Sequence, residues 1–168
     1  MIAMLAKLLK ALNSASSPGQ IALAFALALI TGLTPLFSLH NLLIVFIACI
    51  VRINFSAFLL ATLFFSGLAY LLDPAAIALG ESVLTHSAAQ GFLTELYQSE
   101  FWRVTQFNNT LVMGSLIIAL VAFTPLLLIS RWMISAYRHK LMVWVEKLKI
   151  TKLLKASKFY KVYQALAD

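Results

Sequence analysis

The sequence contains a long uncharged stretch that is interrupted at its centre. No Asp, Glu, Lys or Arg lies between Ala11 and Val51. A membrane-spanning helix needs about 20 apolar residues, so this stretch is too long for one simple span. Its middle, residues 31–41, carries polar side chains together with Gly32 and Pro35. Backbone broken at membrane depth is tolerated only inside protein or beside a water-filled cavity, so we expect function at this break.

The composition predicts an all-α integral membrane protein. The 168 residues are 62% hydrophobic and 11% charged, whereas soluble domains carry about 25% charged residues. This length suits a single domain. The only cysteine, Cys49, lies in an apolar run and is expected to be a small buried side chain.

The distribution of charge predicts how the chain crosses the membrane. Residues 131–168 hold nine Lys or Arg and two acids, whereas residues 73–106 hold four acids and one Arg. Because Lys and Arg beside spans stay in the cytoplasm, we expect both termini inside and residues 73–106 outside. With two clear spans, at 55–72 and 107–130, residues 20–51 must then make no net crossing. A re-entrant helical hairpin that turns near residues 32–41 enters and leaves the membrane on the same side, as this arrangement requires.

Two other courses of the chain compete with re-entry. Segments 20–34 and 41–51 could each cross fully, which keeps the parity, but the second segment is far shorter than a span. A single full span at 20–40 would put either residues 73–106 or the basic tail on the wrong side.

The expected organisation is one membrane domain with five segments. These are a surface helix and breaker at 1–19, the broken hairpin and first span at 20–72, an external loop at 73–106, a last span at 107–130, and a basic cytoplasmic tail helix at 131–168. Asp73-Pro74 is expected to start an external amphipathic helix over 75–98. Pro125 is expected to kink the last span.

No catalytic constellation is evident in the sequence. It contains no Gly-rich phosphate loop, no HExxH and no CxxC, so we expect a non-enzymatic protein without cofactor or metal. The polar residues point instead to a lipid phosphate, since the Arg guanidinium matches phosphate oxygens. The expected ligand-binding residues are Arg52, Asn54, Thr34, Ser38, His40 and Asn41, with Gly32, Pro35 and Pro125 as structural breaks.

Plainer interpretations stand beside each of these roles. Arg52 is equally explained as a topology marker that snorkels to the interface, and the polar residues of the break as partners for its own backbone. His40 is more simply a hydrogen-bonded structural histidine. The basic tail either binds anionic lipid or only sets orientation, and its apolar stripe argues against nucleic acid.

Three short motifs carry a family resemblance. They are Ser17-Pro18-Gly19-Gln20, Gly32-Leu33-Thr34-Pro35-Leu36 and Arg52-Ile53-Asn54. With them the chain resembles domain of unknown function family 2062, small bacterial inner-membrane proteins of similar length. The resemblance implies an inner-membrane location and envelope functions but supplies no activity. One departure is that Ser66-Gly67 and Asp73-Pro74 stand where the broader family tends to have Asn-Pro.

Two functions are compatible with these observations. The first is an envelope lipid-handling or lipid-transport component that holds an anionic phospholipid headgroup at the broken hairpin. The alternative is a structural membrane anchor, or a small subunit, that docks a larger envelope protein. In either case we expect a homo-oligomer or a larger envelope complex.

Overall fold

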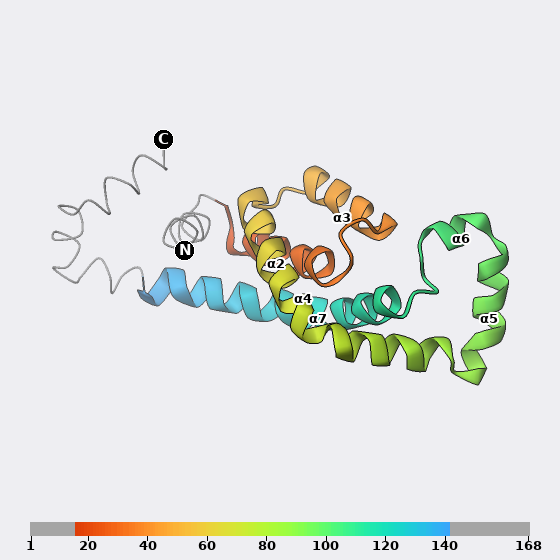
Figure 1. Cartoon of the computed structure of the whole chain (residues 1–168). Helices are drawn as coiled ribbons and strands as arrows, with labels where there is room; N and C mark the ends of the chain where they lie inside the picture. The colour runs from red at the N-terminus through yellow and green to blue at the C-terminus, as the bar shows by residue number, and fades with distance from the viewer. Residues whose placement is uncertain (1–15, 142–168) are drawn as a thin grey trace.

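The computed structural model describes residues 16–141, and all regular structure in this range is helical (Figure 1). The helices are α2 (Pro18–Leu33), α3 (Leu39–Ile50), α4 (Phe55–Leu84), α5 (Ser87–Gln98), α6 (Glu100–Val104) and α7 (Thr110–Ala136), followed by the π-helical turn η1 (Tyr137–Leu141). The predicted all-α class is confirmed for these residues. The expected surface helix near the N-terminus and most of the basic tail lie outside the described range.

Helix α2 lies at the centre of a bundle that α4 and α7 complete. Every residue from Ala26 to Leu33 is buried. The helix begins with a capping box, in which Ser17 N–H donates to Gln20 Oε1 at 2.7 Å and Gln20 N–H donates to Ser17 Oγ at 3.3 Å. Pro18 occupies the first turn, where its missing N–H costs nothing.

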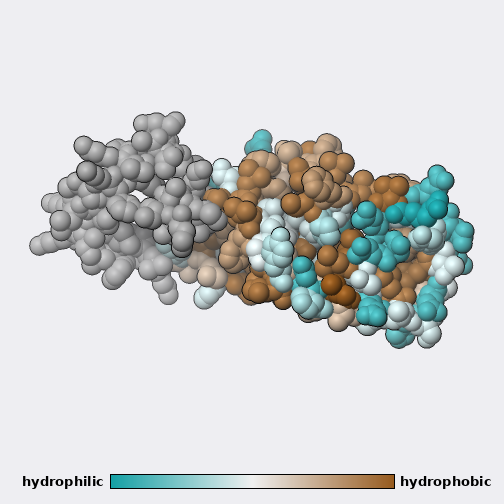
Figure 2. All heavy atoms as spheres, in the orientation of Figure 1, coloured by the Kyte–Doolittle hydropathy of each residue, from teal (hydrophilic) through white to brown (hydrophobic). Residues whose placement is uncertain are grey.

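Helix α3 is as apolar as α2 but lies on the surface of the bundle. Only Asn41 and Ala48 are buried in it, and hydrophobic side chains cover its outer side (Figure 2). Cys49 is exposed, so its expected burial is wrong. The turn before α3 is also uncovered, since the Phe37 side chain is fully exposed.

The α2–α3 hairpin returns to the place where it starts. Asn54, just after α3, donates from Nδ2 to the Oγ of Ser16, just before α2, at 3.3 Å. Figure 1 shows α3 running back along the direction from which α2 came. The start and the end of the α2–α3 hairpin therefore lie side by side.

Among residues 16–141, two helices are long and apolar enough to cross a membrane, Phe55–Leu84 and Thr110–His139. The first runs past the expected end of the span, so the prediction of a new helix at Asp73-Pro74 is wrong. Pro74 lies inside α4, and the helix expected over 75–98 is the end of α4 followed by α5. The last helix likewise runs past residue 130, to Ala136.

The part of α4 beyond Pro74 packs closely on α7. A Cβ atom on Gly80 would overlap the carbonyl oxygen of Thr110, and a Cβ atom on Gly114 would overlap that of Ala76. Only residues without side chains let two helix backbones approach so closely. This crossing holds the second half of α4 against the start of α7, where Asn109 Oδ1 caps α7 by accepting from the N–H groups of Leu111 and Val112.

Candidate functional site

The break between α2 and α3 is a buried cluster of polar groups that bond to one another. Asn41 Nδ2 donates to the carbonyl of Pro35 at 2.9 Å, and Ser38 Oγ donates to the same carbonyl at 2.6 Å. Thr34 Oγ1 lies 2.7 Å from the Ile30 carbonyl and 2.9 Å from Asn41 Oδ1. These side chains therefore satisfy the broken backbone within the chain itself.

His40 is the exception in this cluster. Its Nε2 atom is buried and has no hydrogen-bond partner among the described residues. It lies in the first turn of α3, where the side chain of Ser38 makes no cap hydrogen bond. The N–H groups of Asn41 and Leu42 both donate to the Ser38 carbonyl, at 3.0 and 3.4 Å, so His40 Nε2 is the unpartnered side-chain atom among the described residues of this cluster.

Arg52 and Asn54 lie at the opposite end of α3 from the break. The 12 residues of α3 extend about 18 Å at 1.5 Å per residue. Asn54 serves the backbone, since its Oδ1 accepts from the N–H of Ala57 at 2.9 Å and caps α4. Arg52 is exposed. The structure thus separates the predicted ligand-binding residues into two groups instead of bringing them together.

The three residues predicted as structural breaks have different surroundings. Gly32 packs against α4, where a Cβ atom would lie 2.9 Å from the Thr62 carbonyl oxygen. Pro35 supplies the carbonyl that organises the α2–α3 turn. Pro125 lies inside α7, where the missing N–H leaves the carbonyl four residues earlier, at Val121, without its helical donor.

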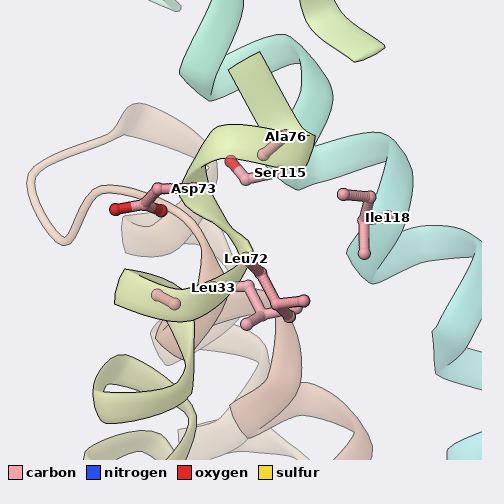
Figure 3. Close-up of a pocket in the computed structure, with 7 residues that line it drawn as sticks. Leu33, Leu72, Asp73, Ala76, Ser115 and Ile118 are labelled. Carbon is pink, nitrogen blue, oxygen red and sulfur yellow. The ribbon is translucent and has the colours of Figure 1, made fainter. Parts of the chain in front are cut away.

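The end of α2 also contributes to a small pocket that Asp73 lines in part, with its carboxylate pointing away from Ser115 and Ile118 (Figure 3). Helices α2, α4 and α7 meet there, and the cavity volume is about 10 Å³, enough for about one water molecule. The lining residues are Leu33, Ala69, Leu72, Asp73, Ala76, Ser115 and Ile118. Of the two charged residues, Asp73 and not Arg52 therefore lines a pocket with the end of α2.

Asp73 was missed as a site residue because Asp-Pro is a strong local signal for a helix start. In the fold it is partly buried in the middle of α4. One signal pointed the other way, because the apolar pattern resumes at once after Pro74 with Ala75, Ala76 and Ile77. Proline is tolerated inside membrane helices, so the pattern, and not the dipeptide, was the better guide.

Comparison with known proteins places this arrangement in a family. The model for uncharacterised proteins conserved in bacteria, DUF2062, matches residues 3–142. The chain belongs to the DUF2062 family. An uncharacterised protein of Treponema pallidum (strain Nichols) is 29% identical over 138 residues, which is 82% of this chain and 85% of the relative. No solved structure gives a significant match.

The DUF2062 match covers every residue that the structure describes. The break, the Asp73 pocket and the glycine crossing all lie within it. Most of the basic tail lies beyond residue 142, outside the match. The membership confirms the resemblance carried by the three short motifs, and the family description names no activity.

Proposed function

We propose that this DUF2062 protein is a non-enzymatic subunit of a bacterial inner-membrane assembly. Its α2–α3 hairpin is re-entrant, and α3 packs against another protein chain. The observation that carries the proposal is the exposure of α3 and of the turn before it, which the rest of the described chain leaves uncovered.

The lengths of α2 and α3, compared with the thickness of the membrane, support re-entry. The hydrogen bond between Ser16 and Asn54 holds both ends of the hairpin at one depth. The 16 residues of α2 and the 12 of α3 extend about 24 Å and about 18 Å, whereas the hydrocarbon core is about 30 Å thick. The turn therefore ends inside the membrane, and a full double crossing is disfavoured by the shortness of α3.

A turn at that depth requires cover by protein. Irregular backbone does not face lipid within the hydrocarbon region. Leu36 and Phe37 are 61% and 102% exposed, and along α3 Leu42, Phe46 and Ile50 are between 61% and 69% exposed. Lipid tails can cover such side chains, but irregular backbone at this depth is kept inside protein. The partner chain supplies that cover, while the turn bonds its own backbone carbonyls.

Site-specific photocrosslinking in native membranes tests this proposal. A photoreactive residue at Phe46, on α3, should give a discrete protein adduct, and its mass identifies either a second copy or a larger partner. The matched control is Leu63 on α4. It is 59% exposed, close to the 61% of Phe46, and should give lipid adducts. Lipid adducts alone from both positions would contradict the subunit function.

A lipid-handling role is the second candidate, and Arg52 is the residue that favours it. Its guanidinium is exposed at the base of the hairpin, and no ion pair is formed with it by the residues that the structure describes. Such a group suits an anionic headgroup at the cytoplasmic interface. Native mass spectrometry should then show a retained anionic phospholipid that Arg52→Ala loses and Arg52→Lys partly keeps. Equal lipid retention in all three proteins would dismiss this role.

A further inference from the structure

Helices α5 and α6 connect the two helices that are long enough to span a membrane, and the bundle leaves both of them exposed. No residue of α5 or α6 is buried by the described chain, and α5 packs mainly on its sequence neighbours α4 and α6. Figure 1 shows both helices at the end of the bundle where α4 ends and α7 begins, with α5 turned across the direction of α4. The depth of this segment is therefore set by the ends of α4 and α7.

Helix lengths place those two ends at a membrane surface. The first 20 residues of α4, from Phe55 to Pro74, extend about 30 Å, and so do the residues of α7 from Thr110 to Arg131. The hydrocarbon core is about as thick, and Arg131 is an exposed charge of the kind that flanks a span. Because Gly80 lies against Thr110, the end of α4 stays near the depth at which α7 starts. A tilt of either helix brings the α5–α6 segment still closer to the lipid.

Helix α5 is amphipathic, and its apolar side is incompletely covered. Ala89, Phe92, Leu93 and Leu96 recur at three- and four-residue spacing, which places them on one side of the helix. Leu93 and Leu96 are half-buried, and Phe92 is 65% exposed. Thr94 is exposed on the opposite side. Helices of this kind lie in the plane of a membrane interface, with the apolar side toward the lipid.

Helix α6 adds aromatic side chains to this surface, and its only positive charge is paired. Phe101 and Trp102 are 64% and 43% exposed, with ring centroids 5.6 Å apart, and aromatic rings are enriched at membrane interfaces. Arg103 pairs with Glu100 at 3.5 Å and lies 6.0 Å from the centroid of the Tyr97 ring. Together α5 and α6 carry two Glu and one Arg. Apolar contact, and not attraction to anionic lipid, must therefore hold the segment to a membrane.

We propose that α5 and α6 lie in the lipid interface at the membrane surface opposite the base of the hairpin, with Phe92 and Trp102 in contact with zwitterionic phospholipid. Lipid is the occupant that the lengths of α4 and α7 bring to this surface. In Figure 2 hydrophilic and hydrophobic side chains are mixed at this end of the molecule, as an interface between lipid and water requires. The inference rests on the membrane location in the proposed function, but not on a partner at α3.

Spin-label accessibility in nanodiscs of phosphatidylcholine alone tests this proposal. The full chain carries Cys49→Ser, which removes its only cysteine, and either Phe92→Cys or Thr94→Cys, which lie on opposite sides of α5. Oxygen dissolves in lipid, whereas a charged or polar nickel chelate stays in water. Relative to the chelate, oxygen should reach the label at position 92 several-fold more effectively than the label at position 94.

Equal access of the nickel chelate to both labels would overturn the proposal, because both sides of α5 would then face water. Protection of position 92 in native membranes but not in the nanodiscs would also overturn it, since a protein would then cover the segment. Should Phe92→Cys fail to fold, Trp102→Cys gives the same readout from α6. Lipid adducts alone at Phe46 would contradict the subunit function and leave these labelling results unchanged, so the two failures are distinguishable.

Discussion

Helices α2 and α3 form one hairpin and are both strongly apolar, yet only α2 is buried. They differ in the size of their side chains. Helix α2 carries four fully buried alanines, Ala22, Ala24, Ala26 and Ala28, whereas α3 is built from Leu, Ile, Val and Phe. In a bilayer, lipid tails are as apolar as leucine, so small residues that allow close approach decide which helices associate. Within the hairpin, the buried helix is therefore the one that carries the alanines.

The glycine contacts extend this rule to the rest of the bundle. Gly32 meets the backbone of α4, and Gly80 and Gly114 bring α4 and α7 together. Helix α3 has no glycine and makes no such contact. Four tests, from the largest expected effect to the smallest, check whether the bundle and α3 differ as described.

Gly114→Leu should have the largest effect, because its side chain would occupy the place of the α4 backbone at Ala76. We expect loss of the folded protein, with a destabilisation above about 3 kcal/mol, measured as yield of monodisperse protein and as Tm. Gly67→Leu is the control, since nothing lies within 4 Å of a Cβ at Gly67. Equal stability of the two variants would show that the crossing of α4 and α7 is not close.

Truncation of one phenylalanine in each region should separate them clearly. Phe58 is 2% exposed in the bundle, and Phe46 is 61% exposed on α3. Phe58→Ala should cost about 3–5 kcal/mol, whereas Phe46→Ala should cost less than about 1 kcal/mol in the isolated chain, measured by chemical unfolding in detergent. A large loss from Phe46→Ala would mean that α3 belongs to the core.

Asn54→Ala should loosen α3 more than α2. It removes the cap of α4 and the bond to Ser16 at the base of the hairpin, at a cost of about 1 kcal/mol. Hydrogen exchange should become faster in α3 and in the first turn of α4, and it should stay slow in α2. Ser56→Ala, at an exposed position, is the neutral control. An equal increase of exchange in α2 and α3 would contradict the expected difference between the two helices.

Thr31→Val should have the smallest effect of the four. It removes the hydroxyl contact of 3.1 Å between Thr31 on α2 and Thr62 on α4. Hydrogen bonds between membrane helices contribute about 0.6 kcal/mol on average, and Thr31→Ser should recover most of that difference. A loss several times larger would make this bond, and not the small residues, the main link between α2 and α4.

The sequence predicted the elements better than it predicted their assembly. The break at Thr34–Ser38 and two long apolar helices are local features of composition and periodicity, and both appear in the fold. The close approach of Gly80, beyond Pro74 on α4, to the start of α7 is a contact between residues far apart in the chain. No local pattern carries such information.

The candidate site illustrates the same limit. Arg52 and the polar break are close in sequence, which suggested one unit, but the rigid length of α3 holds them apart. Asp73 is distant from the break in sequence and yet lines a pocket with the last residue of α2. Which residues lie close together in a helical bundle depends on which helices cross, and short sequence motifs do not predict these crossings.

The central position of α2 has a consequence for how the protein is made. Helix α2 is synthesised before α4 and α7, and α7, which contacts it, is completed only at Ala136. That separation of roughly 100 residues takes about 5–20 s at typical rates of synthesis. During this interval α2 lacks one of the two helices that bury it. The innermost helix of the bundle therefore gains its full set of contacts only after α7 has been made.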